Sequence, residues 1–312
     1  MILILVVPAI QYTMAGIYLL LILATLIIYI LSRNPEKDRT ELKLRIQSWW
    51  MIVFLFSFAI LGNEVTAICF VGLISFLAFK EYISLIPTRR ADRQILFWLY
   101  LSIPLQFYFI YIHWYTMFYV FVPVYMFLFI PLRMVVFGET KGFLRAVGTL
   151  QWGLMITVFS LGHLAAIVTF SPKDPYQTGG TGLLLFVMML TQLNDVAQFC
   201  WGKTLGTHKI VPTVSPKKTW EGFLGGMGTI VVLSFLLAPY LTPFSTFHSI
   251  CLGFIINIGG FFGDTVIGLL KRDLGIKDSG TIIPGHGGIL DRVNSLTYTA
   301  PLFFHFTNYF YY

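Results

Sequence analysis

Apolar runs of membrane-spanning length follow one another along almost the whole chain, beginning with "GIYLLLILATLIIYIL". A helix crosses a hydrocarbon core of about 30 Å with about 17–25 mostly apolar residues. A transmembrane β-barrel would instead show segments of about 10 residues with strict alternation, which these runs lack. Because 57% of the 312 residues are apolar and only 11% are charged, an ordinary soluble domain is excluded. The sequence predicts an all-α fold, a polytopic transmembrane helical bundle.

The spacing of the runs predicts about nine or ten spans. Two runs are short and meet at "GNE", which suits either two tilted helices or one broken segment. No basic region precedes the first run, so we interpret it as a span and not as a signal peptide. The expected spans cover residues 10–32, 49–62, 64–79, 95–113, 114–135, 146–170, 182–201, 222–241, 247–270 and 296–311.

Basic residues fall almost entirely on one side of this scheme. If the basic loops face the cytoplasm, 20 of the 21 lysines and arginines lie inside and only Lys173 lies outside. This asymmetry predicts that both termini lie on the outer face, and we expect an integral protein of the bacterial inner (cell) membrane. The net charge of +7 then reflects topology and gives no evidence for nucleic acid as a partner.

One expected cytoplasmic loop reads "GKTLGTHKIVPTVSPKKTWEGFLGG" over residues 202–226. Its two adjacent lysines offer charges for phosphate, and a turn and a helix start, whose backbone N–H groups favour anions, lie beside them. A lysine-rich loop can also serve only orientation and contact with anionic lipid. The predicted substrate-binding residues here are Ser215, Lys217, Lys218, Thr219 and Glu221, with the two lysines assigned to phosphate.

A second loop, "KRDLGIKDSGTIIPGHGGILDR" at residues 271–292, concentrates seven charged side chains in a mostly apolar chain. Asp264 precedes it inside an expected span, where a carboxylate is costly enough to indicate function. Lys271 follows Asp264 by about two helical turns on the same face. Asp291 and Arg292 open the last helix, so two acidic groups are expected at the membrane face. One or two carboxylates together with substrate phosphates are typical of Mg²⁺ sites.

Each of these residues also has a structural interpretation. Asp264 could be a buried partner of Lys271 or Arg272 that only joins two helices, and the two cations could be anchors at the membrane surface. His286 could be a solvated loop histidine, and Lys277 with Asp278 a surface pair that contributes little. The concentration of all of them in one loop between two spans favours a functional site.

At these residues the sequence resembles a known family, the phosphatidate cytidylyltransferases, or CDP-diacylglycerol synthases. The family signature runs roughly Ser-x-x-Lys-Arg, four residues, Lys-Asp, then His-Gly-Gly, Asp-Arg and a final Asp. The resemblance is close over both loops and diffuse over the N-terminal half. It implies transfer of the cytidylyl group from CTP to phosphatidic acid, giving CDP-diacylglycerol and pyrophosphate, with Mg²⁺ required and K⁺ as a further cation. A homodimer is implied by the resemblance alone.

The resemblance and the charges together predict a role for each site residue. Two anions must meet at the α-phosphorus of CTP, so catalysis is expected to consist mainly of neutralisation, positioning and metal stabilisation. The phosphatidate tails are expected to enter from the bilayer between late helices. The predicted catalytic residues are Asp264, Lys271, Arg272, Asp291 and Arg292; the metal ligands are Asp264, Asp291 and Asn294; further substrate-binding residues are Lys277, Asp278, His286, Gly287 and Gly288.

This sequence departs from the family signature at three positions. Gly268 stands in place of the serine, Ile267 in place of the acidic residue that often precedes it, and Asn294 in place of the closing aspartate. An asparagine carbonyl coordinates a hard cation more weakly than a carboxylate does. The changes are therefore also consistent with a divergent paralogue that acts on another lipid phosphate, has weakened activity, or serves as a non-catalytic binding partner.

We expect the chain to divide functionally in two. Residues 1–180 would supply N-terminal transmembrane helices that support the bundle or oligomerisation. Residues 181–312 would form the catalytic region, with cytoplasmic loops at 202–221 and 271–293. A transporter would also use intramembrane acids, but inverted repeats are expected there, and the Asp264 region has no second copy in the first half.

Overall fold

The structure, a computed structural model, describes residues 8–32, 40–89, 93–138, 140–280 and 287–312. Regular structure in these ranges is helical, apart from isolated bridge residues, of which Lys209 and Thr219 pair with each other. The helices are α1 (Pro8–Leu31), α2 (Thr40–Leu61), α3 (Glu64–Leu85), α4 (Arg93–Tyr111), α5 (Tyr115–Val120), η1 (Phe121–Met126), α6 (Phe127–Phe137), α7 (Phe143–Leu154), η2 (Met155–Phe159), α8 (Ser160–Val168), α9 (Gly179–Leu205), α10 (Trp220–Leu241), α11 (Thr246–Asp273), α12 (Ile289–Val293) and α13 (Leu296–Tyr311).

Nine segments in the described ranges are long and apolar enough to cross a membrane. Two of them are composite, since α5, η1 and α6 form one span and α7, η2 and α8 another. The prediction of an all-α polytopic bundle is thereby confirmed. The last helix, α13, has 16 residues, a length of about 24 Å at 1.5 Å per residue.

The two short apolar runs that meet at "GNE" are two separate helices, α2 and α3. Asn63 caps α3, because its side-chain oxygen accepts a hydrogen bond of 2.8 Å from the Thr66 backbone N–H. Both helices are longer than their apolar runs, since their polar ends continue the helix at residues 40–48 and 80–85. One broken segment is therefore excluded.

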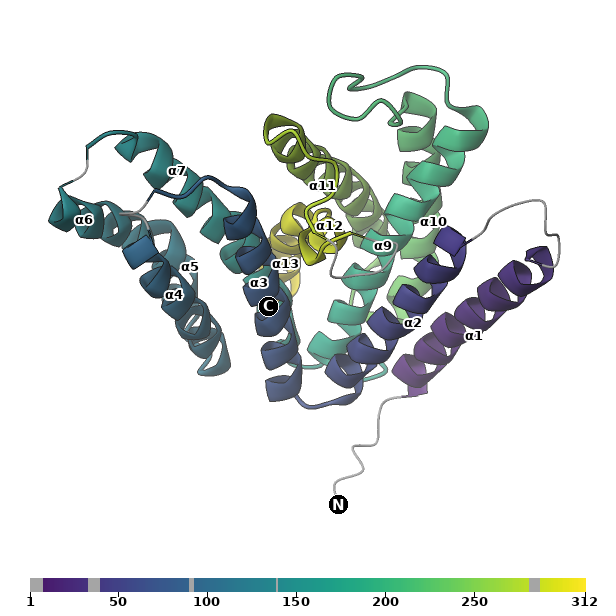
Figure 1. Cartoon of the computed structure of the whole chain (residues 1–312). Helices are drawn as coiled ribbons and strands as arrows, with labels where there is room; N and C mark the ends of the chain where they lie inside the picture. The colour runs from purple at the N-terminus through teal and green to yellow at the C-terminus, as the bar shows by residue number, and fades with distance from the viewer. Residues whose placement is uncertain (1–7, 33–39, 90–92, 139, 281–286) are drawn as a thin grey trace.

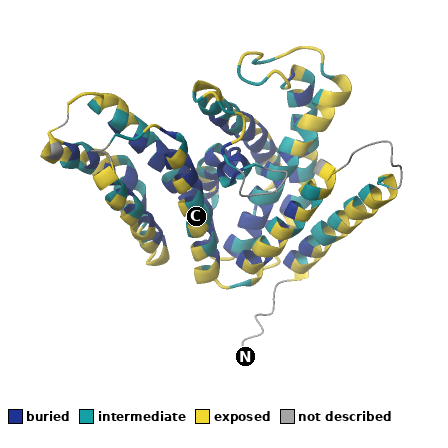
Figure 2. Cartoon of the chain, viewed as in Figure 1, coloured by how far each residue is buried: buried dark blue, intermediate teal, exposed yellow. Residues whose placement is uncertain are grey.

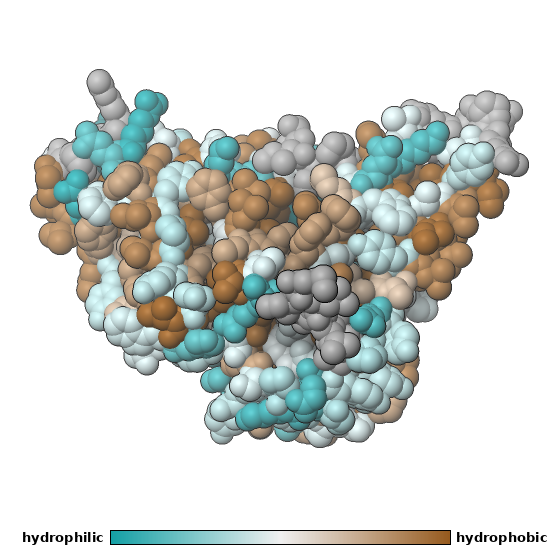
Figure 3. Space-filling view, turned by 90° about the horizontal axis from the view of Figure 1, so that it is seen from below, coloured by the Kyte–Doolittle hydropathy of each residue, from teal (hydrophilic) through white to brown (hydrophobic). Residues whose placement is uncertain are grey.

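The C-terminal half forms a compact group of helices in which α9 packs on α10, α10 on α11, and α11 on α13. The N-terminal half joins it through α8, which packs against α13 and α9, and through α3, which packs against α12, while α1 lies against α2 (Figure 1). Burial is deepest where the halves meet, and outward faces of α1 and α4 are exposed (Figure 2). Viewed from the end at which α1 begins, the outer flanks are largely apolar (Figure 3), as expected for helices that face lipid.

Most loops that carry described basic residues lie at one end of the bundle. In Figure 1 the connection between α9 and α10 and the end of α11 point to the top, whereas the turn between α2 and α3 lies at the bottom. Lys173 donates a hydrogen bond to the Tyr311 carbonyl at the end of α13. After α11 the chain turns back into the bundle, so that the short helix α12 packs against α3. This return positions the functional site.

Candidate functional site

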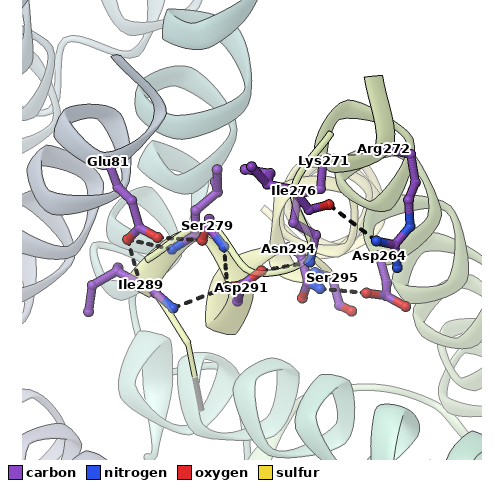
Figure 4. A network of polar contacts seen from close by, with 12 residues as sticks. Glu81, Asp264, Lys271, Arg272, Ile276, Ser279, Ile289, Asp291, Asn294 and Ser295 are labelled. Carbon is purple, nitrogen blue, oxygen red and sulfur yellow. Dashed lines mark hydrogen bonds and ion pairs between the residues drawn. The ribbon is translucent and has the colours of Figure 1, made fainter. Parts of the chain in front are cut away.

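Asp264 of α11 lies at one end of the polar network in Figure 4, next to Asn294. Lys218 comes from the loop before α10, and its Nζ lies 2.7 Å from Asp264 Oδ2. The same ammonium donates to Thr265 Oγ1 at 2.9 Å and to the Phe261 carbonyl at 3.2 Å, and it lies 4.4 Å from the centre of the Phe261 ring. The structure therefore brings the two predicted loops together at one carboxylate.

Asn294 contacts the second carboxylate oxygen of Asp264, Oδ1. Its side-chain Nδ2 donates a hydrogen bond of 2.6 Å to Asp264 Oδ1, and its Oδ1 accepts the Ser295 backbone N–H at 2.7 Å. An aspartate at position 294 could not donate to Asp264 in this way. The departure from the family signature at this position thus has a specific structural consequence.

Asp291, which the sequence analysis grouped with Asp264 and Asn294 as a metal ligand, has other partners than these two residues. Its Oδ1 accepts a hydrogen bond of 2.6 Å from Lys271 Nζ, and its Oδ2 accepts the backbone N–H groups of Ser279 at 2.8 Å and Gly288 at 3.1 Å. Burial alone would raise the pKa of Asp291, but the hydrogen bonds and the charge of Lys271 together hold this pKa below its usual range. The carboxylate orders the segment that leads into α12.

Two carboxylates that the sequence analysis missed also contact this region. Asp195 of α9 accepts hydrogen bonds of 3.0 and 2.8 Å from Ser295 Oγ, and it interacts electrostatically with Asp264 and Lys218. Glu81 of α3 accepts the backbone N–H groups of Ile289 at 2.7 Å and Leu290 at 3.3 Å.

The missed residues carry the same signal that identified Asp264. Asp195 lies inside an expected span, and Glu81 follows an expected span directly, so the cost of a carboxylate in an apolar segment applied to both. Glu81 also accepts a short hydrogen bond from Ser279 Oγ. The N-terminal half, expected only to support the bundle, thus supplies an anchor for the catalytic loop.

In the lysine-rich loop, the predicted residues divide between structural contacts and exposed positions. Thr219 caps α10 by accepting the Gly222 N–H at 3.2 Å. Glu221 accepts the Thr207 N–H at 3.0 Å and lies 2.6 Å from His208 Nδ1, which ties the loop to its own helix. Lys217 is exposed, and Ser215 is half-buried in the turn.

The remaining predicted residues lie around the end of α11. Arg272 donates to the carbonyls of Val214 at 3.4 Å and Ile276 at 3.2 Å, so it joins the two loops. Lys277 and Asp278 are exposed. Arg292 is half-buried, and its Nε is a buried donor with no hydrogen-bond partner among the described residues.

The glycines before α12 allow a close approach to Glu81. A Cβ on Gly288 would lie 1.4 Å from Glu81 Oε1, so no side chain fits there. Gly287 has a φ of 79°, a conformation that favours glycine. His286 lies outside the described residues. At Gly268, by contrast, a Cβ would meet nothing closer than Val214 Cγ1 at 3.7 Å.

The described residues contain no group of three or more His, Cys, Asp and Glu side chains arranged to hold a metal ion. Asp195 and Asp264 nevertheless offer carboxylate oxygens from adjacent helices, and Asn294 and Ser295 lie between them. This oxygen set suits a hard cation completed by substrate phosphates. The metal-binding roles of Asp264, Asp291 and Asn294 remain predictions.

The fold and the site together define a class: a polytopic helical membrane protein with acidic and basic side chains gathered where two loops meet at one end of the bundle. The chain belongs to the Cytidylyltransferase family, whose profile matches residues 43–310. It is 45% identical over 300 residues to the Uncharacterized protein YnbB of Escherichia coli (strain K12), covering 96% of this chain and 98% of that protein.

Relatives with a printed activity match over a shorter length. The Phosphatidate cytidylyltransferase of Haemophilus influenzae is 39% identical over 153 residues, 47% of this chain and 52% of that protein. The Phosphatidate cytidylyltransferase 4, chloroplastic, of Arabidopsis thaliana is 46% identical over 113 residues, 36% of this chain and 29% of that protein. The chain thus matches about half or less of the length of these two relatives.

Proposed function

We propose that this protein transfers the cytidylyl group of CTP to a lipid phosphate, with phosphatidic acid as the acceptor. The observation that carries the proposal is the contact of Lys218 and Asn294 with the two oxygens of Asp264, at 2.7 and 2.6 Å. A cation from the lysine-rich loop and a carboxylate of α11 suit a site where phosphates and a metal ion meet. Membership of the Cytidylyltransferase family supports the same chemistry.

The reaction requires no covalent enzyme intermediate. An oxygen of the lipid phosphate attacks the α-phosphorus of CTP, the bond between the α-phosphorus and the bridging oxygen breaks, and pyrophosphate leaves with that oxygen. The products are CDP-diacylglycerol and pyrophosphate. Because both reactants are anions, the main task of the protein is to hold them in line and to neutralise their charge.

The cations of the site have separate tasks in this proposal. Lys218 and Arg292 bind phosphate, and the unpartnered Nε of Arg292 is a donor available to a phosphate oxygen. Lys271 holds Asp291 and so fixes the loop before α12. Arg272 keeps the lysine-rich loop against the end of α11. Lys217, which is exposed, meets the outer phosphates of the nucleotide.

Asp264 and Asp195 would hold Mg²⁺, with the Asn294 carbonyl as a weaker ligand and K⁺ as a second cation. The bound metal would stabilise the charge that develops on the departing pyrophosphate. Lys218 and Asn294 contact the two carboxylate oxygens of Asp264. Binding of a nucleotide phosphate would draw Lys218 away and free Asp264 Oδ2.

A second candidate function is favoured by Asn294. The amide of Asn294 stands where the family signature has a carboxylate, and it donates a hydrogen bond to Asp264 Oδ1. Both features fit a paralogue with a different acceptor or reduced turnover. Purified protein supplied with labelled CTP and a panel of lipid phosphates separates the two. Fastest product formation with phosphatidate supports the main proposal. Faster turnover of another lipid phosphate, or binding of CTP without product, would favour the paralogue.

A further inference from the structure

A cavity of about 650 Å³ lies beside the site, between the end of α3, the start of α7 and the last turns of α11. Its lining includes Leu270 and Leu274, which flank Lys271 and Arg272 on α11. It also includes Tyr82, the neighbour of Glu81. The cavity and the site therefore share two helices, one from each half of the chain.

The mouth of the cavity is basic. Arg89, Lys141 and Arg145 line it together with one acidic residue, Asp273, so the charged lining residues sum to +2. Lys141, Arg145 and Asp273 are exposed, and Arg89 donates a hydrogen bond to the Lys141 carbonyl. That bond joins the connection after α3 to the connection before α7.

The inner wall is apolar and aromatic. Tyr82 and Leu150 are buried to at least 98%, and the ring of Trp152 lies 5.9 Å from that of Tyr82. Tyr82 is fully buried and its hydroxyl donates to the Thr149 carbonyl at 2.8 Å, so it backs the wall, whereas the half-buried Trp152 and Leu270 present apolar surface to the cavity. Lining residues extend along α7 from Gly142 to Trp152, a length of about 15 Å along the helix at 1.5 Å per residue.

A ligand with an anionic head group and an apolar body fits a cavity that has a basic mouth and an apolar inner wall. A free phosphate or a soluble phosphate ester would gain nothing from the inner wall, whereas a lipid would bury its upper chains there. The charge of +2 at the mouth matches a phosphomonoester, which carries about −1.5 to −2 at neutral pH, better than a phosphodiester with a single charge.

We propose that this cavity binds a lipid phosphomonoester, with its head group among Arg89, Lys141 and Arg145 and its upper acyl chains against Trp152 and Leu270. The lipid is the acceptor, held next to the site before transfer. The role as acceptor rests on the proposed function, but the binding itself does not. The N-terminal half then forms part of the substrate site, and the lipid lies against α3 and α7 as well as a late helix.

Gly148 provides a test of the cavity. A Cβ at this position would meet nothing within 4 Å, and the residue lines the cavity, so Gly148→Trp should place its indole in the cavity. Gly228 on α10 also meets nothing within 4 Å but lies outside the cavity, which makes Gly228→Trp the matched control.

The readout is photolabelling without CTP. Protein in phosphatidylcholine vesicles receives phosphatidate with a diazirine near the top of one acyl chain, and labelled peptides are mapped. We expect label on the segments that contain Trp152 and Leu270, at least tenfold less in Gly148→Trp, and no change in Gly228→Trp, where tenfold corresponds to about 1.4 kcal/mol. Phosphatidylglycerol with the same diazirine should label these segments less. Equal labelling in wild type and Gly148→Trp would overturn the proposal.

Charge removal gives a second test that does not depend on filling the cavity. Lys141→Gln with Arg145→Gln should weaken phosphatidate labelling by about thirtyfold, the product of about 5.5-fold for each cation near the membrane surface. Lys43→Gln with Lys203→Gln removes two exposed charges away from the cavity and should leave labelling unchanged. If labelling fell equally in both double variants, any loss of surface charge would weaken it, and a lipid site in the cavity would be contradicted.

Kinetics then separate binding from the role as acceptor. In the Lys141→Gln, Arg145→Gln variant the KM for phosphatidate should rise about thirtyfold while the KM for CTP stays unchanged. Reduced labelling with an unchanged KM for phosphatidate would overturn the acceptor role. If wild-type protein binds phosphatidate in the cavity but forms no CDP-lipid, the proposed function fails while the binding site stands.

Discussion

Lys217 and Lys218 are neighbours in one loop, but the structure gives them different surroundings. Lys217 is exposed, whereas the Lys218 side chain is 14% exposed and is held by Asp264, Thr265 and Phe261. The sequence assigned both lysines to phosphate without distinguishing them. The contact of Lys218 with Asp264 joins residues 46 positions apart, and no local pattern predicts such a pairing.

Because Lys218 is the cation nearest the central carboxylate, its removal should be far more damaging than removal of Lys217. We expect Lys218→Ala to lower turnover about 100-fold, the usual cost of losing a group that stabilises the transition state. Lys217→Ala should cost about fivefold, mainly in the KM for CTP, since an exposed charge contributes little. Equal losses in the two variants would contradict the distinct role of Lys218. Turnover of both purified proteins decides the point.

Asn294→Asp tests the unusual amide. The new carboxylate would face Asp264 where an N–H now donates at 2.6 Å, with Asp195 close by, so like charges repel unless a cation binds between them. In EDTA the thermal midpoint should fall by a few degrees, since about 1 kcal/mol of repulsion shifts it by about 2–4 °C. Mg²⁺ should restore most of this loss and should bind about tenfold more tightly.

The control for this variant is Asn63→Asp, which adds the same charge at the exposed cap of α3, where aspartate caps equally well. Its midpoint should not respond to Mg²⁺ beyond the wild-type response. An Asn294→Asp protein that keeps the wild-type midpoint in EDTA would mean that Asn294 and Asp264 are not in contact.

At the level of elements, α12 depends on a distant helix for its position. It has only five residues, and Glu81 of α3 accepts the N–H groups of its first two residues. Asp291 and Asn294 both face α11, where they contact Lys271 and Asp264. Asn294 and Ser295 keep right-handed helical dihedrals although α12 ends at Val293, so side chains three residues apart still point toward the same neighbouring helix.

Glu81→Ala should loosen the segment that leads into α12. Two backbone N–H groups would lose their acceptor, at a cost of about 1–3 kcal/mol for each one left buried and unsatisfied. We expect a lower thermal midpoint and turnover reduced at least tenfold, through misplacement of Asp291 and Asn294. Faster hydrogen exchange at residues 287–293 should accompany the loss.

Glu64→Ala is the matched control on the same helix. Glu64 lies at the opposite end of α3, with 39% of its side chain exposed and only His113 at 3.4 Å as an ion-pair partner. Its substitution should change neither turnover nor exchange at residues 287–293. If both glutamate variants behave alike, α12 does not depend on Glu81.

The helices and some site residues can be predicted from the sequence, whereas the contacts between them cannot. Long apolar runs predict the helices well, because a spanning length and the absence of alternation are properties of the sequence itself. Asp264 was predicted from the cost of a carboxylate in a span, and that rule also applied to Asp195 and Glu81. Which cation meets which carboxylate depends on packing between loops far apart in the chain, so it required the structure.

At the scale of the whole molecule, the two ends of the bundle differ in charge. The loops before α10 and after α11 meet at one end, and Lys173 contacts Tyr311 at the other. The positive-inside rule places the first end in the cytoplasm. The orientation of the site follows from this assignment and remains a prediction.

Cysteine labelling in intact cells tests the orientation. In a variant without Cys69, Cys200 and Cys251, Lys173→Cys should react with an impermeant maleimide, whereas Thr207→Cys should react only after the membrane is opened. Both positions are exposed in the structure, so a difference in labelling reports the side of the membrane. The reverse pattern would invert the topology and place the site outside the cell.

Cytidylyl transfer is tested most directly by following the α-phosphate and the γ-phosphate of CTP separately. Purified protein receives phosphatidate, Mg²⁺ and CTP labelled with ³²P at either the α- or the γ-phosphate. Cytidylyl transfer predicts that the α-label appears in a lipid and the γ-label in pyrophosphate, and that Asp264→Asn forms neither product while remaining folded. Label from the γ-phosphate in lipid, no labelled lipid from the wild type, or normal turnover by Asp264→Asn would contradict the account.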